Sequence, residues 1–484
     1  MAAAFLSSPP ALLLSVAAFL YIVRWLSNRK RQDVHRVPSA PPALAHWLWG
    51  HELATFQGQA TETYTKWAAL CGPFFRVKGA LFHPDIIVAA DHAAVQHIFQ
   101  NADDYVKSPA FRPPVANVLG KGLVWAEGED HKTQRRIIAP AFSLDIIGRV
   151  AFGHDFKAGQ STEAKEIHAS WEGHVNTGLG FGGFVAMLVM RAVPFITLLL
   201  TKLPVEAIRA GGRIREITTK LSMRLLESGS VSEKGRDIMS ILVKAERAGA
   251  SKGGAALTPQ QIVDNVNTFI MVGHETTAGS LSFTLLELAR RPEVQEKLRD
   301  EIRRVGRDLS YDDIQRLEYL DAVVKEGLRL HPASPQTERV ALRDDVIPLS
   351  KPITTAAGET LSSIRVRAGQ VFHIPFTTMH VNPSVWGPDA AQFDPARWLT
   401  PGRVPPPSAL PHGWSGLVTF CDGPRNCIGY RLAVFEFKVI LATLVRSLEF
   451  HETTAVVLEK ISPTLQPVVD GRGGLLPLHI TLAQ

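Results

Sequence analysis

Ten residues near the C-terminus, FCDGPRNCIG at positions 420–429, decide how the whole chain is interpreted. Cys427 follows a loop that Gly423 opens, and glycine permits the tight backbone path that a metal-bound thiolate needs around it. A helix is expected directly after the loop, and its N-terminal end would bring partial positive charge near the sulfur. Arg425 lies two residues before the cysteine, where a guanidinium can pair with an anionic group of a bound cofactor. The pattern as a whole therefore favours an iron-ligating thiolate at Cys427, although a lone cysteine in a Gly-rich loop is usually structural.

Cysteine use and charge exclude several classes of protein. The only other cysteines are Cys71 and Cys421, and an odd total of three argues against a disulfide framework. Paired CxxC motifs, which indicate zinc sites, are absent from the sequence. The net charge of +6 comes without a dense basic stripe, so nucleic acid is not an expected partner. This excess indicates either a solvated surface or a docking face for an acidic partner.

The body of the chain is predicted to be mainly α with small β-sheets. The sequence of 484 residues has no internal repeat and no long Gly/Ser linker, so one large catalytic domain is expected. Helical periodicity covers Ala93–Gln100, Asp130–Ile138, Pro259–Arg290, Pro292–Val305, Tyr319–Arg329 and Tyr430–Leu448. Short strands are predicted at Phe74–Lys78, Ile86–Ala89, Leu361–Val366 and Val371–Ile374. This order excludes a regular alternation of strands and helices.

The N-terminus is predicted to be a membrane signal anchor over residues 1–31. Ala11–Val23 is apolar apart from one serine, and Arg24 and the basic run at 28–31 follow it. A cleaved signal peptide would carry its charge before the apolar run, whereas charge after the run fits a cytosolic catalytic domain. A Pro-rich hinge is expected at 32–45 and the catalytic domain at 46–484.

A second apolar stretch, Val185–Leu203, is interrupted by Arg191 and Pro194, so a further membrane span is not expected. Two interpretations stay open for it. In the first, the stretch contacts lipophilic surroundings, either by dipping into the bilayer surface or by lining a lipophilic entrance. In the second, it forms a buried pair of helices.

Three other motifs accompany the cysteine loop. Glu326 and Arg329 are three positions apart in a predicted helix, which places them on one face. The stretch FDPARW at 393–398 supplies Arg397 as a further partner. The stretch VGHETT at 272–277 lies inside the long apolar helix predicted at Pro259–Arg290.

Taken together, these motifs resemble the cytochrome P450 family. The resemblance implies haem b with Cys427 as the axial iron ligand. It implies that Thr276 hydrogen-bonds iron-bound oxygen and that Glu275 relays protons, with Gly273 weakening the helix to make room. The alternative is that the threonines have no catalytic role and only hydrogen-bond backbone carbonyls of their own helix. Glu326, Arg329 and Arg397 are implied to form a buried structural triad below the haem.

Further cofactor-binding residues follow from the same resemblance. Phe420, Gly423 and Arg425 belong to the haem-binding loop itself. His131 and Arg135, one helical turn apart, are implied to face the haem propionates, as is Arg339. A surface role is the alternative for each of these last three residues.

One departure from the family lies after residue 143. Pro140–Ser143 is followed at once by Leu144–Gly148, which resembles a segment that in relatives comes several tens of residues later. The P450 fold is therefore expected to lack the intervening helices, which would support the oxygen-binding helix.

The resemblance implies a monooxygenase that inserts one atom of O2 into a lipophilic small molecule of secondary metabolism, for example a terpenoid. The sequence has no flavin or nicotinamide fingerprint, so electrons are expected from NADPH through a separate reductase. An endoplasmic reticulum membrane location is expected from the anchor. The alternatives are a truncated haem-binding protein with little or no activity and, less favoured, a haem-thiolate isomerase or dehydratase.

Overall fold

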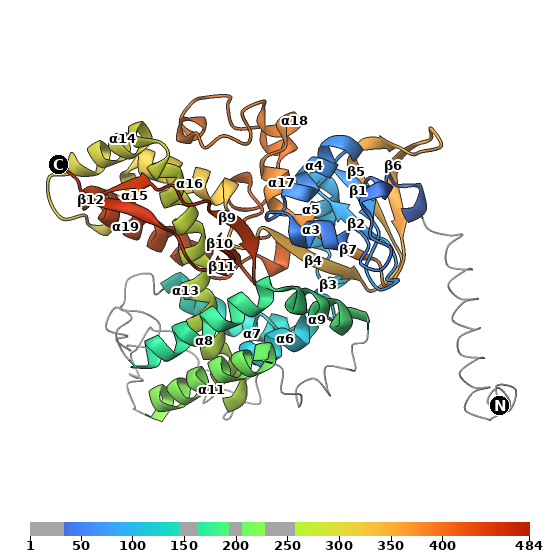
Figure 1. Ribbon diagram of the computed structural model, residues 1–484, viewed down its shortest axis with the longest axis horizontal. Coiled ribbons are helices and arrows are strands. Elements are labelled where there is room, and N and C mark those ends of the chain that lie inside the picture. The colour runs from blue at the N-terminus through green and yellow to red at the C-terminus, as the bar shows by residue number, and fades with distance from the viewer. Residues whose placement is uncertain (1–32, 145–161, 193–205, 228–256) are drawn as a thin grey trace, which may run out of the picture.

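The computed structural model describes residues 33–144, 162–192, 206–227 and 257–484. Helices dominate, and the strands form small sheets, so the predicted fold class is confirmed (Figure 1). The larger helices are α3 (Glu52–Gln57), α4 (Glu62–Cys71), α5 (His92–Gln100), α6 (Arg112–Val118), α7 (Gly128–Leu144), α8 (Thr162–Leu179), α9 (Phe181–Ala192), α11 (Glu206–Glu227), α13 (Pro259–Ala289), α14 (Pro292–Arg303), α15 (Tyr311–Arg316), α16 (Glu318–Leu330), α17 (Phe376–His380), α18 (Pro383–Trp386) and α19 (Tyr430–Ser447).

A five-stranded sheet forms the β-rich part of the molecule, in the order β1-β2-β7-β4-β3. Within it β2 and β7 are parallel and the other neighbours antiparallel. Its strands are β1 (Phe74–Val77), β2 (Ile86–Ala89), β3 (Tyr105–Val106), β4 (Gln336–Ala341) and β7 (Val371–Pro375). Three smaller sheets contain β5 (Asp345–Thr354), β6 (Thr360–Val366), β8 (Leu448–Glu452), β9 (Leu458–Ile461), β10 (Leu465–Val469), β11 (Arg472–Gly473) and β12 (Leu478–Leu482).

The helix-rich part is built around the long helix α13. Its start is fixed by a capping box between Thr258 and Gln261, with Pro259 in the first turn. One hydrophobic core lies between α13, α14, α16 and α19, and a second joins α6, α11 and α13. In addition, Asn267 of α13 donates a hydrogen bond to Thr219 of α11. Near the start of α13, every residue from Ile262 to Thr268 is therefore buried.

The predicted helices and strands are all present, and most of their ends agree closely with the sequence-based expectations. Helices α8 and α11 and the C-terminal strands β8–β12 were not predicted. Polar residues interrupt the apolar pattern of both helices, and the strands are short. Helix α7 ends at Leu144, and residues 145–161 lie outside the described part. The absence of helices after residue 143 therefore stays a prediction.

The N-terminal anchor over residues 1–31 also lies outside the described residues. From Asp33 onward the Pro-rich segment packs on the sheet, because the amide of Ala40 donates to the carbonyl of Arg76 at 2.9 Å. Among the described helices, none is by itself long and apolar enough for a membrane span. Helices α8 and α9 meet that criterion only as a pair over Lys165–Arg191, with a bend of 78°.

A buried ionic network joins α16 to the segment that follows α18. Glu326, Arg329 and Arg397 have no exposed side-chain surface. The Glu326 carboxylate accepts two hydrogen bonds from Arg329, at 2.7 and 2.9 Å, and lies 3.5 Å from the guanidinium of Arg397. It also accepts a hydrogen bond from the indole of Trp398 at 2.9 Å. The three charged residues that the sequence indicated are therefore in contact.

Replacing Arg329 by leucine should destabilise the fold strongly. The change leaves the Glu326 carboxylate without its bidentate partner, and breaking a buried pair in this way typically costs about 3–5 kcal/mol. Denaturant unfolding followed by tryptophan fluorescence measures the loss. As a control, Arg307→Leu removes a guanidinium that is 61% exposed and pairs with Asp313, so it should change the unfolding midpoint little. Equal midpoints for the two variants would contradict this role of the network.

Candidate functional site

A cavity of about 2140 Å³ lies between α6, α9, α13, β4 and the loop before α19. Ligand pockets usually measure roughly 300–1,000 Å³, so this space can hold more than one molecule. Its lining is predominantly apolar and includes seven of the predicted site residues: His131, Arg135, Glu275, Thr276, Arg339, Arg425 and Cys427. The structure therefore brings together residues from four separate stretches of sequence.

The loop that carries Cys427 is held from both sides. The Cys427 amide donates to the carbonyl of Phe420 at 2.7 Å, and the ring of Phe420 packs against Trp414 and Tyr430. At Gly423 the backbone has φ +66°, and a Cβ there would lie 2.4 Å from the carbonyl oxygen of Phe99. Neither Phe420 nor Gly423 lines the cavity, so both act on the loop rather than on a ligand.

A buried histidine ties this loop to the ionic network. His380 accepts a hydrogen bond from the Val418 amide at 3.0 Å, and its other ring nitrogen lies 2.9 Å from the carbonyl of Arg329. Burial lowers the pKa of His380 to about 3, so the ring is neutral and can accept that bond. Thr419 adds a bond to the carbonyl of Leu328 at 2.9 Å. The two residues just before Phe420 are thus fixed to α16.

Positive charge gathers at the same end of the cavity. His131, Arg135, Arg339 and Arg425 line it, and so does Lys107, which the sequence analysis did not single out. Burial, together with the charges of Arg425, Lys107 and Arg135, lowers the pKa of His131 to about 3. Burial also lowers the pKa of Lys107 to about 8. Burial is the main cause of both shifts, and the neighbouring cations add to it.

One carboxylate, Glu127, contacts this group of cations. It forms an ion pair with Arg425 and lies 3.7 Å from the ammonium of Lys107. His131 and Arg339 are each only 6% exposed, so the alternative of a surface role does not fit them. Arg135 is partly buried and donates to the carbonyl of Asn426 at 2.7 Å, next to the cysteine.

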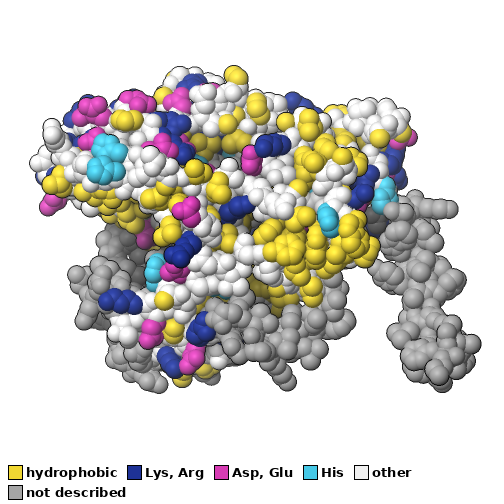
Figure 2. Space-filling model, viewed as in Figure 1, with side chains coloured by type: hydrophobic (Ala, Val, Ile, Leu, Met, Phe, Trp, Pro, Cys, Tyr) yellow, Lys and Arg dark blue, Asp and Glu magenta, His cyan; other side chains and the backbone are white. Residues whose placement is uncertain are grey.

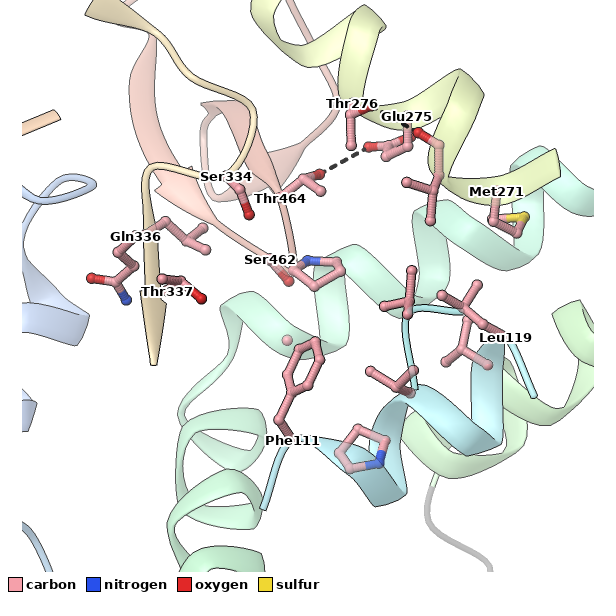
Figure 3. A pocket seen from close by; sticks show the side chains of 18 of the residues that line it. Phe111, Leu119, Met271, Glu275, Thr276, Ser334, Gln336, Thr337, Ser462 and Thr464 are labelled. Carbon is pink, nitrogen blue, oxygen red and sulfur yellow. Dashed lines mark hydrogen bonds between the residues drawn. The ribbon is translucent and has the colours of Figure 1, made fainter. Parts of the chain in front are cut away.

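Helix α13 carries the other predicted site residues. The Thr276 hydroxyl donates to the carbonyl of Val272 at 2.8 Å, which is the back-bonded geometry that was considered as the alternative. The residue nevertheless faces the cavity (Figure 3). Helix α13 continues as an α-helix through Gly273, and the expected local weakening of the helix stays a prediction. A Cβ at Gly273 would meet nothing within 4 Å, so the glycine leaves open space beside the helix.

Glu275 is held by strand β10. Its carboxylate accepts a hydrogen bond from the Gln466 amide at 2.5 Å. It accepts another from the Thr464 hydroxyl at 3.5 Å (Figure 3). Sequence reasoning missed both partners, as it missed Lys107 and Glu127. None of the four lies in a recognisable motif, and their contacts to the site cross long stretches of chain.

Comparisons with known proteins identify the family. Residues 141–469 match the family model described as Cytochrome P450. This chain belongs to the cytochrome P450 family. It is 32% identical to cytochrome P450 monooxygenase claO of the fungus Ampulloclitocybe clavipes, with 96% of each chain covered. It is 28% identical to cytochrome P450 monooxygenase 128 of Postia placenta, with 91% of each chain covered. The protein is thus a fungal-type P450 monooxygenase.

The cavity fits the cofactor of a P450, which is a haem whose iron is ligated by cysteine. Haem carries two propionates. Lys107, Arg135, Arg339 and Arg425 line the cavity as cations that can pair with these anions, and the neutral ring of His131 can donate a hydrogen bond to them. Burial raises the pKa of the Cys427 thiol to about 11, so the thiolate requires a bound cation, which iron provides. Cys421 also lines the cavity, whereas Cys71 does not.

Replacing Cys427 by alanine should abolish the thiolate-type absorption of the reduced carbon monoxide complex. Cys421→Ala and Cys71→Ala are the matched controls and should leave that absorption nearly intact, because the helix that follows Cys427 directs its dipole at that sulfur. Absorption spectra of the three purified variants decide the matter. A thiolate-type spectrum from Cys427→Ala would show that the ligand is another residue.

Proposed function

We propose that this P450 monooxygenase oxidises a lipophilic small molecule of secondary metabolism, such as a terpenoid, with electrons from NADPH through a separate reductase. One observation carries the proposal. Thr276, Glu275 and Cys427 all face a single cavity whose remaining wall is mostly apolar. The absence of a flavin or nicotinamide fingerprint from the sequence favours a separate electron donor.

Each site residue has a defined task in this proposal. Cys427 holds the iron, and Arg135, Arg339 and Arg425, with His131, bind the propionates. The bound haem supplies the activation of dioxygen. Thr276 releases its bond to the Val272 carbonyl and donates its hydroxyl into the cavity.

Glu275 moves protons from the β10 side toward Thr276. Its contacts with Gln466 and Thr464 hold the carboxylate while no proton is transferred.

A shortened haem-binding protein with little or no activity is the second candidate. The alignment to the claO relative runs over 532 residues and is therefore longer than this chain, so the relative has residues without a counterpart here. The family match begins at residue 141, beside the proposed junction at Ser143–Leu144. Helix α13 is buried from Ile262 to Thr268, and α11 covers part of it. This burial argues against a strong destabilisation of the fold by the proposed missing segment.

Co-expression with a reductase tests both candidates. The full chain, fed with lipophilic candidates, should yield products heavier by one oxygen atom in mass spectrometry. Thr276→Ala should keep NADPH consumption but lower product and raise hydrogen peroxide, because protons are no longer delivered correctly. Haem binding without any product would favour the second candidate.

The matched control for Thr276 is Thr284→Ala. Thr284 lies on the same helix and donates to the carbonyl of Ser280 at 2.9 Å, but it does not line the cavity. Coupling of NADPH to product should therefore stay as in the wild type. A similar rise of peroxide in both variants would count against proton delivery by Thr276.

The domain arrangement is also proposed: an anchor at 1–31 in the endoplasmic reticulum membrane, a hinge at 32–45 and a cytosolic catalytic domain at 46–484. Helix α9 contains the first part of the second apolar stretch, and residues 193–203 of that stretch lie outside the described residues. The helix lines the cavity and exposes Phe181 and Met187. Figure 2 shows hydrophobic side chains gathered in the region where Figure 1 places α3 and α9. This surface suits a lipophilic entrance near the bilayer.

Removing Met1–Arg31 should release the protein from membranes without removing haem. The reason is that the apolar run with its basic flank lies wholly within this segment. Sedimentation of membranes from cells that express either form gives the readout, with the full chain expected in the pellet. A shortened form that still sediments would assign membrane binding to the surface of α9.

A further inference from the structure

The cavity wall has one polar side, built from the start of β4 and the turn between β9 and β10. Figure 3 shows this side, with Ser334, Gln336, Thr337, Ser462 and Thr464 around the same space. Three of these residues are already engaged by protein atoms. The Thr337 hydroxyl accepts from Arg339 at 2.6 Å, Ser462 donates to the carbonyl of Val175 at 2.7 Å, and Thr464 contacts Glu275 and Gln466.

Ser334 and Gln336 differ from these neighbours. Within the described part of the chain, no hydrogen bond is made by the Ser334 hydroxyl or by the Gln336 amide. The backbone on both sides of Ser334 is fixed, because the carbonyls of Ala333 and Pro335 accept from the Leu465 and Phe376 amides at 2.8 Å each. Ser334 is exposed and Gln336 is partly buried, so two polar groups face the cavity with no protein partner among the described residues.

The facing side is apolar. Leu119, directly after α6, and Met271 of α13 are buried, belong to one hydrophobic core and line the cavity. Phe111, just before α6, adds an aromatic ring on the same side (Figure 3). A hydrocarbon body against this side gains roughly 25 cal/mol for each Å² of apolar surface removed from water.

The charges near the cavity favour a neutral polar group over an ionised one. Ser334 and Gln336 are uncharged. Arg191 is held by Glu52 in a buried ion pair, and Lys460 donates to the backbone carbonyl of Gln57 at 2.7 Å. The cations Arg135, Arg339 and Arg425 of the same cavity are assigned to the haem propionates. Ser334 and Gln336 themselves offer no positive charge to a substrate carboxylate, whose desolvation there would be costly.

We infer that the substrate has a hydrocarbon body and one neutral oxygen function, a hydroxyl or carbonyl, which Ser334 and Gln336 bind. The inference rests on the proposed function, because it concerns the same cavity. Thr276 lines the same cavity, in which oxidation of the hydrocarbon body takes place. A C–H bond is broken and one atom of O2 becomes the new hydroxyl. The other atom leaves as water, formed with two electrons from NADPH and two protons. The enzyme therefore acts after a reaction that introduces the first oxygen.

Three probes with one skeleton test the inference: dodecane, 1-dodecanol and dodecanoic acid. Each is titrated into the full-length holoenzyme, and the low-spin to high-spin change of the haem absorption gives its dissociation constant. The alcohol should bind about two- to tenfold more tightly than the alkane, which is the effect of one net hydrogen bond. Dodecanoate should bind more weakly than the alcohol.

The double variant Ser334→Ala, Gln336→Leu should lose the preference for the alcohol and keep its affinity for dodecane. Leu119→Ala is the matched control on the apolar side, and it should weaken the alkane and the alcohol by the same factor. The reduced carbon monoxide spectrum of each variant establishes that the haem site is intact.

Several results would overturn the inference: equal binding of alkane and alcohol by the wild type, tightest binding of dodecanoate, or no spectral change with any probe. An unchanged preference in the double variant would do so as well. A holoenzyme that shows the expected preference but never forms an oxygenated product would instead overturn the proposed function alone.

Discussion

The carboxylate of Glu326 is the point on which the organisation of the site depends. It neutralises Arg329, and Arg329 in turn donates to the carbonyls of His380 and Gln392. The ring of His380 accepts a hydrogen bond from the amide of Val418, which lies just before the cysteine loop. A buried charge is stable only when it is paired and hydrogen-bonded, so each of these contacts requires the next one. The position of the cysteine loop is thus set by a chain of obligatory polar contacts that begins on α16.

On the cavity side of the loop the electrostatic situation is reversed. The network around Glu326 is balanced within the protein, whereas the cations around Arg425 are compensated only by Glu127 among the described residues in contact with them. Such a cluster favours a dianionic ligand and disfavours the empty site. The protein therefore combines a rigid, self-sufficient support with a binding surface that is completed by its cofactor.

Local signals in the sequence were sufficient for much of this architecture. The glycines and the cysteine of the loop, the spacing of Glu326 and Arg329, and the long apolar period of α13 each act within a few residues, so they were readable without a structure. Lys107, Gln466 and Ser334 were not, because each acquires its meaning from residues far away in the chain. In the sequence Gln466 is an ordinary polar residue. Only the fold brings it into contact with Glu275, which lies 191 positions away in the chain.

The two sides of the haem site are also far apart along the chain. Arg135 and its hydrogen-bond partner Asn426 are separated by 291 positions. At a synthesis rate of about 5–20 residues per second, the cationic wall emerges from the ribosome about 15–60 s before the cysteine that completes the site. During that interval the basic residues lack both the loop and the thiolate. Cofactor capture by a nascent chain must therefore wait until translation is nearly finished, and the cations remain solvated until then.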